Sequence, residues 1–369
     1  KTGEPVAYCG NADMDYERAG RWVDIARSPR SSGSILKPLL YCAALQEGQI
    51  LPQMLLSDIP TDFGGFAPKN YNGTFQGAVP ADDAIAQSLN VPCVGMLKDY
   101  GVMKFVETLK DCGITTFNAP ASKYGLSVIL GGAEVNLLEI TKLYAEMAAY
   151  YQTVDSTENC NFPLNDKMAL YHTFEAMRKV NRPDQLDWRR VSSVQNVAWK
   201  TGTSYGSRDA WAIGLTPNYA VGVWVGNADG SGTPNLTGAR TAGPVMFDLI
   251  GLLPFSHWFD KPEHKPRHIR VCKHSGHRAG KYCTETRSIQ AFESTTEGPV
   301  CPYCHPVHLS LDRRYRIIDR SEPTITKNVF TLPPSMEHYY KKIHPEYVSL
   351  PAVKANPHQA NFQESPMKI

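Results

Sequence analysis

Three short groups of hydroxyl, amine and amide side chains occur in order within the first 203 residues. Ser34 and Lys37 form a Ser-x-x-Lys pair, and Ser88 and Asn90 form a Ser-x-Asn pair. Lys200 then opens the sequence Lys-Thr-Gly-Thr. A serine hydroxyl is a weak nucleophile that needs a neighbouring base. The three groups together predict one site that contains a nucleophile, its base and an anion-binding strand.

The order of these groups is more informative than any one of them, because two of the three also recur elsewhere. A second Ser-x-x-Lys pair, Ser365 and Lys368, lies in a polar tail with no room for the other groups downstream. A second Lys-Thr-Gly occupies residues 1–3, where it is typical of a hairpin turn between strands. Because this copy precedes every candidate serine, neither extra copy fits the order of the three groups.

Lys37 is the predicted base, because histidine is nearly absent from this part of the chain. His172 is the one histidine in the first 255 residues, and it lies in a polar, charged stretch. A Ser-His-Asp triad is therefore not expected. To be neutral near pH 7, Lys37 needs a pKa about three units below the usual lysine value near 10.4. Burial and repulsion from a second cation, Lys200, would both lower the pKa.

Ser88 and Asn90 are predicted to serve the base and the substrate. The Ser88 hydroxyl can relay a proton between Ser34, the base and a leaving amine. The Asn90 side chain has both an acceptor and donors, so it can hold a substrate amide and orient Lys37. Simpler interpretations exist for each group: Ser34 as a helix N-cap, Ser88 and Asn90 as a cap or turn pair, and Lys200 as a solvated strand residue.

The polar end of the third group is predicted to bind substrate. Thr201 and Thr203 offer hydroxyls that can bind a substrate carboxylate beside the lysine charge. Gly202 allows another backbone to approach closely, and Ser204 completes the candidate substrate-binding set. The backbone N–H groups of Ser34 and Thr203 are the candidate oxyanion hole, in which one donor is typically worth about 3 to 4 kcal/mol.

Local sequence patterns predict the elements that must hold these residues. An apolar run after Ser34 would place this serine at a helix N-terminus, with Lys37 one turn later on the same face. Residues 194–204, which contain the third group, are typical of a strand that becomes polar at its end, and a hairpin is expected after it. Helices are expected at residues 35–45, 84–89, 167–180 and 243–253, and strands at residues 194–204, 211–215 and 219–225.

Further sequence groups make residues 3–255 resemble the transpeptidase domain of class A penicillin-binding proteins, with the 1C type as the nearer likeness. The Cys/His-rich stretch at residues 272–305 and Leu-Pro-Pro-Ser-Met-Glu at residues 332–337 also resemble the 1C type. The other groups are Pro-Lys-Asn-Tyr-Asn at 68–72, Phe-Gln-Gly at 75–77, Tyr-Gly-Leu-Ser at 124–127, Leu-Gly-Gly at 130–132, Arg-Asp-Ala-Trp-Ala-Ile-Gly at 208–214 and Val-Trp-Val-Gly-Asn at 223–227.

The resemblance implies an α/β fold of the α+β kind, with a mostly antiparallel five-stranded sheet, helices on both faces and a small Cys/His-rich C-terminal extension. It implies an acyl-serine D,D-transpeptidase, in which Ser34 attacks the D-Ala-D-Ala bond of a peptidoglycan stem peptide. An amine of a second stem peptide would take the acyl group, and β-lactams would acylate the same serine. A D,D-carboxypeptidase or β-lactamase with the same site, and a poorly catalytic cell-wall scaffolding module, remain as alternatives.

The resemblance also implies a location at the periplasmic face of the inner membrane, through an N-terminal anchor that this chain does not include. Cell-wall synthesis proteins are possible partners, and no cofactor is expected. The formal net charge of +2 gives no reason to expect a nucleic-acid partner. We expect a transpeptidase domain at residues 1–255, the Cys/His-rich extension at 256–350 and a flexible tail at 351–369.

Eight of the nine cysteines fall into two sets of four, and Cys160 stands apart. Four are in apolar contexts that predict buried thiols, and Cys160 lies in a polar stretch that allows either state. The other four cluster in the extension, where they permit two disulfides, a zinc site or free thiols. An extracytoplasmic location favours the disulfides. The first set is Cys9, Cys42, Cys93 and Cys112, and the clustered set is Cys272, Cys283, Cys301 and Cys304.

Overall fold

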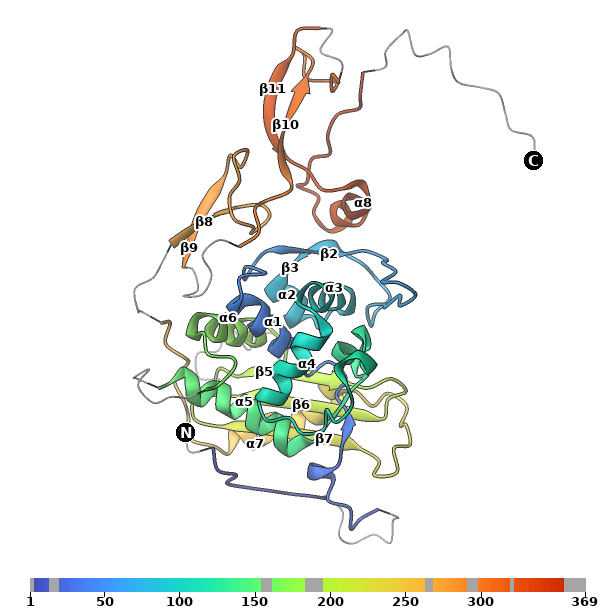
Figure 1. Cartoon of the computed structure of the whole chain (residues 1–369), viewed down its shortest axis with the longest axis vertical. Helices are drawn as coiled ribbons and strands as arrows, with labels where there is room; N and C mark the ends of the chain where they lie inside the picture. Colours follow the sequence, from blue (N-terminus) through green and yellow to red (C-terminus); the bar gives the residue numbers. More distant parts are fainter. Residues whose placement is uncertain are drawn as a thin grey trace, which may run out of the picture.

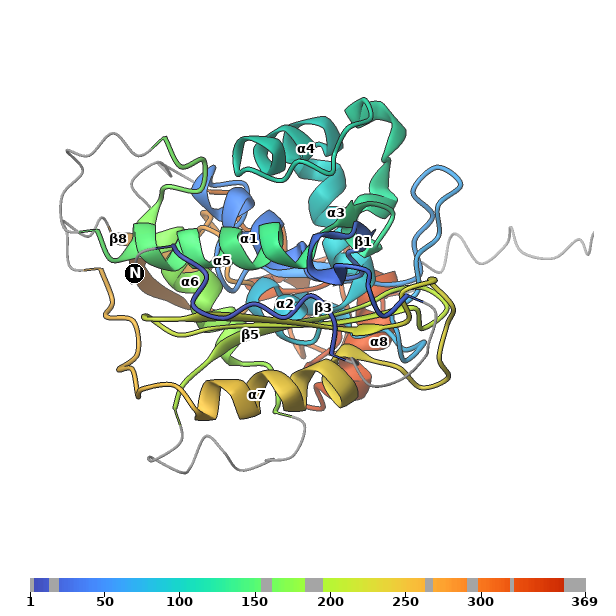
Figure 2. The ribbon, with the colours of Figure 1, turned by 90° about the horizontal axis from the view of Figure 1, so that it is seen from below.

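The computed structural model arranges the chain in three layers, with an extension at one end (Figure 1). Most helices cover one face of a central sheet and α7 covers the other, as Figure 2 shows. In the described ranges, no helix combines the length and apolar composition needed to cross a membrane. The structure describes residues 3–12, 20–153, 161–182, 195–262, 268–290, 298–318 and 322–354.

The central sheet is antiparallel, with strand order β5-β6-β7. The strands are β5 (Ala198–Thr203), β6 (Asp209–Leu215) and β7 (Ala220–Gly226). Every residue of β6 is buried, because β6 is the middle strand and helices cover both of its faces. The three predicted strands are thereby confirmed. Where five strands were implied, this sheet has three among the described residues. The hairpin turn predicted at residues 1–3 would be followed by a strand, but residues 3–9 are exposed and without strand structure.

Helix α1 (Lys37–Gln46) is the centre of the helical layer. Residues 37–45 are all buried, so the helix is enclosed by its neighbours on every side. This enclosure explains why its sequence is apolar all round except for Lys37. The other helices of this layer are α2 (Ala81–Ala86), α3 (Asn90–Tyr100), α4 (Val102–Asp111), α5 (Leu137–Tyr151) and α6 (Lys167–Arg178).

The opposite face of the sheet is covered by α7 (Gly243–Gly251). Met246 and Ile250 of this helix pack with Trp199 in a second apolar cluster. Gly214 of β6 lets α7 approach closely, because a Cβ there would lie 2.6 Å from the sulfur of Met246. The predicted helices at 167–180 and 243–253 are confirmed by α6 and α7.

Short elements connect these layers. Two-stranded sheets pair β1 (Arg30–Ser31) with β4 (Glu134–Val135), and β2 (Leu55–Asp58) with β3 (Gly77–Pro80). The 3-10 helices are η1 (Ile25–Arg27), η2 (Ala121–Lys123) and η3 (Leu126–Leu130), and a π-helical turn, η5 (Gly238–Ala242), precedes α7.

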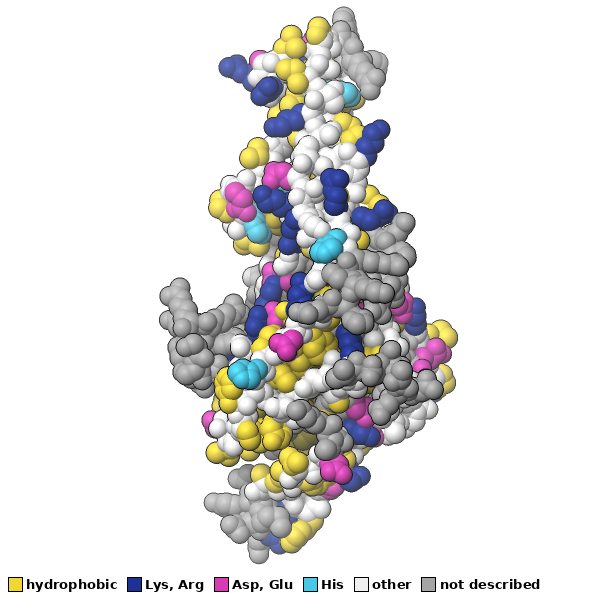
Figure 3. All heavy atoms as spheres, turned by 90° about the vertical axis from the view of Figure 1, so that its left-hand side faces the viewer, with side chains coloured by type: hydrophobic (Ala, Val, Ile, Leu, Met, Phe, Trp, Pro, Cys, Tyr) yellow, Lys and Arg dark blue, Asp and Glu magenta, His cyan; other side chains and the backbone are white. Residues whose placement is uncertain are grey.

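The C-terminal extension consists of two hairpins and a helix beyond β2 and β3 (Figure 1). Figure 3 shows Lys and Arg side chains along its surface, with fewer acidic ones. Helix α8 lies against β3, where a Cβ on Gly77 would come within 2.1 Å of the Met336 carbonyl oxygen. The elements are β8 (His268–Cys272) paired with β9 (Thr286–Gln290), β10 (Cys304–Leu309) paired with β11 (Ile325–Phe330), and α8 (Pro334–Ile343).

The segment after α7 docks onto α6. The rings of Phe259 and Phe174 stack with their centroids 4.4 Å apart. The indole N–H of Trp258 donates a hydrogen bond to Glu175 Oε1 at 2.5 Å. These contacts bury Phe259 and tie the start of the extension to the helical layer.

Replacing Phe259 by Ala is expected to lower the free energy of unfolding by about 3 to 5 kcal/mol, because it empties a packed aromatic site. The measurement is chemical denaturation followed by fluorescence. Phe255→Ala is the matched control, since Phe255 is 58% exposed and its loss leaves no cavity. Equal destabilisation by the two substitutions would contradict the docking of this segment.

Candidate active site

Lys37 occupies the first position of α1 and is completely buried. Its Nζ donates hydrogen bonds to Asn90 Oδ1 at 2.7 Å and to the Ser88 carbonyl oxygen at 2.8 Å. The first two predicted groups therefore meet through direct hydrogen bonds. The carbonyl of Ser88 was not foreseen as a partner of Lys37, since sequence reasoning considered only the Ser88 hydroxyl.

Ser34 lies in the turn that leads into α1 and is partly exposed. The helix begins at Lys37, two residues later than predicted, and its N-cap residue is Leu36, which makes no side-chain cap hydrogen bond. Ser34 is therefore not the helix cap. The Lys37 N–H donates to the Ser34 carbonyl oxygen at 3.3 Å, so the two residues are one turn apart as predicted.

The turn that carries Ser34 is held by hydrogen bonds from three directions. The Trp211 indole N–H donates to the Ser31 carbonyl at 2.8 Å, and the Tyr144 hydroxyl donates to the Ile35 carbonyl at 2.7 Å. The Ser32 N–H donates to the Ala133 carbonyl at 3.0 Å. Because β6, α5 and the segment before β4 all bind its backbone, the turn presents Ser34 from a fixed position.

Two glycines let this turn lie directly on β5. A Cβ on Gly33, whose φ is +52°, would come within 2.7 Å of the Thr203 nitrogen. A Cβ on Gly202 would come within 2.8 Å of the Ser32 carbonyl oxygen. Any side chain at these positions would push the turn and the strand apart. The backbones beside Ser34 and Thr203 are thus in van der Waals contact.

The hydrogen-bond register of β5 leaves Thr203 facing this turn. The Ser204 N–H donates to the Asp209 carbonyl of β6. Because antiparallel pairing alternates along a strand, the N–H and C=O groups of Thr203 and Thr201 point away from β6. The Lys200 Nζ uses one of these groups, the Thr201 carbonyl, at 2.7 Å.

Ser88 connects the two buried lysines. Lys200 Nζ donates to the Ser88 hydroxyl at 2.7 Å, while Lys37 binds the carbonyl of the same residue. Ser88 has a left-handed backbone, with φ of +55°. The helix predicted at residues 84–89 is wrong in extent: α2 ends at Ala86, a tight turn follows, and α3 begins at Asn90. A left-handed residue ends a helix in this way.

Asn70 and Asp58 support Asn90, a role that sequence reasoning missed. The Asn70 Oδ1 accepts the Asn90 backbone N–H at 2.9 Å, and its Nδ2 donates to the buried Asp58 carboxylate at 2.7 Å. The Asn90 Nδ2 donates to the Lys69 carbonyl at 2.7 Å, which leaves its Oδ1 for Lys37. The Pro-Lys-Asn-Tyr-Asn group at residues 68–72 was the available signal, but its role depends on contacts across the fold.

The Ser204 hydroxyl is already bonded within the protein. Ser204 is buried, and its hydroxyl donates to Asp209 Oδ2 at 2.8 Å. The other Asp209 oxygen accepts the Trp224 indole N–H at 3.1 Å. Ser204 thus belongs to the link between β5, β6 and β7. Thr203 is partly exposed, and its hydroxyl accepts the Gly238 N–H at 3.1 Å.

Burial lowers the pKa of both lysines. The pKa of Lys37 falls to about 8, because its ammonium group is fully desolvated. Burial is also the main cause of the lowered pKa of Lys200, and the positive charge of Lys37 adds to it. The predicted repulsion between the two cations therefore acts mainly on Lys200, not on Lys37 as expected. Two ammonium groups that share Ser88 cannot both keep a proton at low cost.

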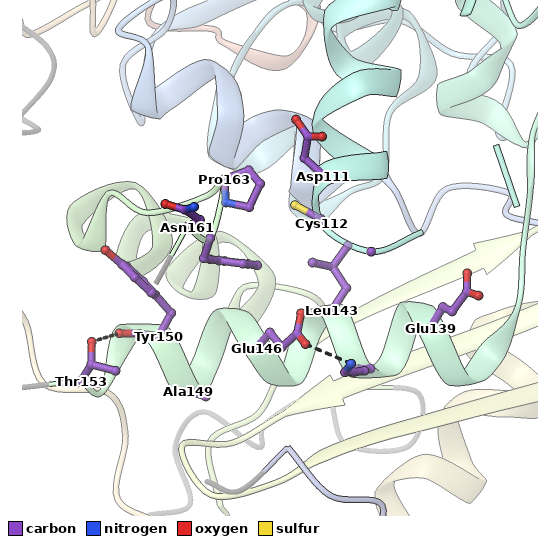
Figure 4. Close-up of a pocket in the computed structure, with 13 residues that line it drawn as sticks. Asp111, Cys112, Glu139, Leu143, Glu146, Ala149, Tyr150, Thr153, Asn161 and Pro163 are labelled. Carbon is purple, nitrogen blue, oxygen red and sulfur yellow. Dashed lines mark hydrogen bonds and ion pairs between the residues drawn. The ribbon is translucent and has the colours of Figure 1, made fainter. Parts of the chain in front are cut away.

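A separate cavity of about 610 Å³ lies between the end of α4, α5 and residues 161–163 (Figure 4). Asp111, Leu143 and Pro163 are among the residues that line it. Its lining includes none of the predicted site residues. The predicted site residues therefore do not gather in this cavity.

The described cysteines are all free thiols. Cys42, Cys93 and Cys112 are buried as predicted, whereas Cys9 is exposed because its segment forms no strand and lies at the surface. The two disulfides expected in the extension are not formed. Cys160, the second Ser-x-x-Lys pair at Ser365 and Lys368, and nearly all of the predicted tail lie outside the described residues.

The fold and these motifs agree with the result of the family comparison. The sequence matches the family described as Penicillin binding protein transpeptidase domain over residues 1–250, and the chain belongs to this family. It is 32% identical over 249 residues to penicillin-binding protein 1C of Escherichia coli, covering 67% of this chain and 32% of that protein. It is 28% identical over 273 residues to penicillin-binding protein 1B of Haemophilus influenzae, covering 68% and 34%.

Solved structures support the fold. Penicillin-binding protein 1A from Haemophilus influenzae superposes with a TM-score of 0.57 at 18% identity, covering 76% of this chain and 50% of that chain. PonA1 from Mycobacterium tuberculosis in complex with penicillin V gives 0.54 at 20% identity, covering 65% and 73%. The chain spans about a third of the length of the curated relatives named above.

Replacing Asn70 by Ala is expected to lower the free energy of unfolding by about 1 to 3 kcal/mol, because Asp58 and the first N–H groups of α3 lose their partner. Chemical denaturation measures the change. Tyr71→Ala is the matched control, since Tyr71 is 86% exposed. If Asn70→Ala were as stable as this control, the support of Asn90 by Asn70 would be wrong.

Proposed function

We propose that this chain is the acyl-transferring part of a D,D-transpeptidase that joins peptidoglycan stem peptides. One observation carries the proposal: Lys37, Lys200, Ser88 and Asn90 form a continuous set of hydrogen bonds one turn from Ser34. A hydroxyl beside a buried amine of lowered pKa is the arrangement that acyl transfer through serine requires. Membership of the transpeptidase family supports the same reaction.

In the proposed first step, the uncharged Lys37 amine takes the proton of the Ser34 hydroxyl. The Ser34 oxygen bonds to the carbonyl carbon of the penultimate D-Ala, and the C–N bond to the terminal D-Ala breaks. Ser88 gives its hydroxyl proton to the leaving nitrogen and takes up the proton that Lys37 received, so D-alanine departs with a neutral amine and Lys37 is uncharged again. In the second step, the amine of another stem peptide attacks the ester carbon and gives a proton to Lys37. The C–O bond to Ser34 breaks, and Lys37 returns this proton to the Ser34 oxygen.

The strand β5 is proposed to hold the donor peptide. The outward N–H of Thr203 and the N–H of Ser34 would stabilise the oxyanion, and Gly33, the residue before Ser34, lies directly against the Thr203 backbone. Thr201, Gly202 and Thr203 would bind the terminal carboxylate beside Lys200. Ser204 is left out of this set, because its hydroxyl is bonded to Asp209.

The proposal also covers the location of the protein, its partners and its domain boundaries. Peptidoglycan lies outside the cytoplasmic membrane, so we infer an extracytoplasmic location, at the periplasmic face of the inner membrane, for the protein that contains this chain. Cell-wall synthesis proteins are its proposed partners, and β-lactams are its proposed inhibitors. Residues 1–255 are proposed as the transpeptidase domain, residues 256–350 as the extension and residues 351–369 as the tail.

Incubation with a penicillin is expected to add one penicillin mass to the chain, on the peptide that contains Ser34. Intact-mass and peptide-mapping mass spectrometry measure the adduct. Ser34→Ala should remove it, whereas Ser310→Ala, which changes an extension serine, should keep it. An adduct on another peptide, or one that survives Ser34→Ala, would refute the assignment of the nucleophile.

The same assay separates the alternative activities. Rapid loss of the adduct by hydrolysis would indicate a β-lactamase. Release of D-alanine from a stem peptide without a cross-linked dimer would indicate a D,D-carboxypeptidase. Absence of any adduct from the folded protein would favour a scaffolding module.

The rate constant of acylation is expected to rise about tenfold between pH 7 and pH 9. With a pKa of about 8, the neutral fraction of Lys37 grows from about a tenth to about nine tenths over this range. Stopped-flow acylation by a chromogenic β-lactam gives the profile. Lys37→Arg, which stays charged, should slow acylation by at least 10²-fold, while Lys123→Arg in η2 should not change it. A flat profile would exclude Lys37 as the base.

A further inference from the structure

The four cysteines of the extension come together in one cluster. Their sulfur atoms all lie within 4.8 Å of one another. Cys272 ends β8 and Cys304 begins β10, while the other two lie in the loops between these strands. Two of the four are buried, and the other two are partly buried. Four sulfurs from three segments thus enclose a single point, with Cys301 and Cys304 three residues apart in the same segment.

We propose that this cluster, Cys272, Cys283, Cys301 and Cys304, is a structural zinc site. The sulfurs of Cys272 and Cys304 are 3.7 Å apart. Zinc binds four thiolates in a tetrahedron with Zn–S distances of about 2.3 Å, which places any two sulfurs about 3.8 Å apart. A disulfide requires about 2.05 Å. The spacing fits the edge of a zinc tetrahedron and does not fit a bonded pair.

Hydrogen-bond donors surround the sulfurs, as thiolates bound to a metal require. The Gly280 N–H donates to Cys283 Sγ at 3.3 Å, and the Ser275 hydroxyl donates to Cys301 Sγ at 3.2 Å. Such donors offset the negative charge that four thiolates bring to one zinc ion and fix the direction of each sulfur. The bond from Ser275 also gives a reason for a serine three residues after Cys272.

The nearby histidines are not needed as ligands. His305 Nε2 is hydrogen-bonded to the Thr331 hydroxyl at 3.0 Å, and His308 Nδ1 is bonded to the Thr326 hydroxyl at 2.9 Å. The partner of His308 lies in β11 and the partner of His305 directly follows this strand, and neither histidine is among the residues whose ligand atoms come together in the cluster. The ligand set is four cysteines, which is the composition of a closed structural site.

The proposed zinc would hold the extension on the domain below it. The Ser275 carbonyl accepts the Leu55 N–H at 2.8 Å, and Gly276 has a φ of +67°. A Cβ on Gly276 would come within 2.0 Å of the Gln53 carbonyl oxygen. The turn after Cys272 is therefore pressed against the start of β2. An extension with so small a core needs such a link to keep one shape.

The test uses the full chain, exported to an oxidising compartment and purified without chelator. Elemental analysis by mass spectrometry is expected to find one zinc per chain. Cys283→Ser should lose this zinc, and Cys9→Ser, which changes the exposed cysteine outside the cluster, should retain it. Replacement of the zinc by Co²⁺ should give the absorption bands of a tetrahedral thiolate site.

Two results would overturn the proposal. One is a metal-free chain whose intact mass is lower by four hydrogens, which shows two disulfides. The other is a metal-free chain with all four thiols reactive. Because Cys283→Ser could fail to fold, zinc-edge X-ray absorption of the unmodified chain gives an independent answer, with four sulfur neighbours expected and oxygen neighbours contradicting the site. None of these readouts depends on acylation of Ser34.

Discussion

The structure depends on the burial of two lysine ammonium groups that share one serine. Lys37 and Lys200 are both nearly inaccessible to water, and each donates a hydrogen bond to Ser88. Removing two like charges from water is unfavourable unless acceptors replace the solvent. The surrounding fold supplies these acceptors and excludes water. The same burial lowers both pKa values. The free-energy cost of burying the two ammonium groups and their readiness to give up a proton therefore have the same cause.

Several helices and strands must begin or end near the two lysines to supply these acceptors. The acceptor of Lys37 on Asn90 is oriented by the Lys69 carbonyl, and the start of α3 is held by Asn70, which is in turn fixed by Asp58. Burial raises the pKa of Asp58, while hydrogen bonds from Asn70 and the Gln76 N–H oppose that rise. Each buried polar group is thus satisfied by the next, as buried polar networks require.

Sequence reasoning identified the residues that meet at the site better than it identified what holds them. The ordered motifs predicted that Ser34, Lys37 and Lys200 belong together, and local patterns found β5 to β7. The left-handed backbone of Ser88 and the contact of Gly33 with Thr203 depend on distant segments, so no local pattern could predict them. Ser204 illustrates the same limit, because its hydroxyl looks available in the sequence until its partner Asp209 is located.

The strand β2 joins the site to the C-terminal extension. Its first residue, Leu55, binds the turn after Cys272, and its last residue, Asp58, binds Asn70 beneath the lysine pair. The four residues of β2, each paired with a residue of β3, include both contacts. This paired strand is therefore a continuous physical connection between the extension and the carboxylate of Asp58. The extension thus contacts the strand that supports Asn90, whereas none of its described residues takes part in the hydrogen bonds around Lys37 and Lys200.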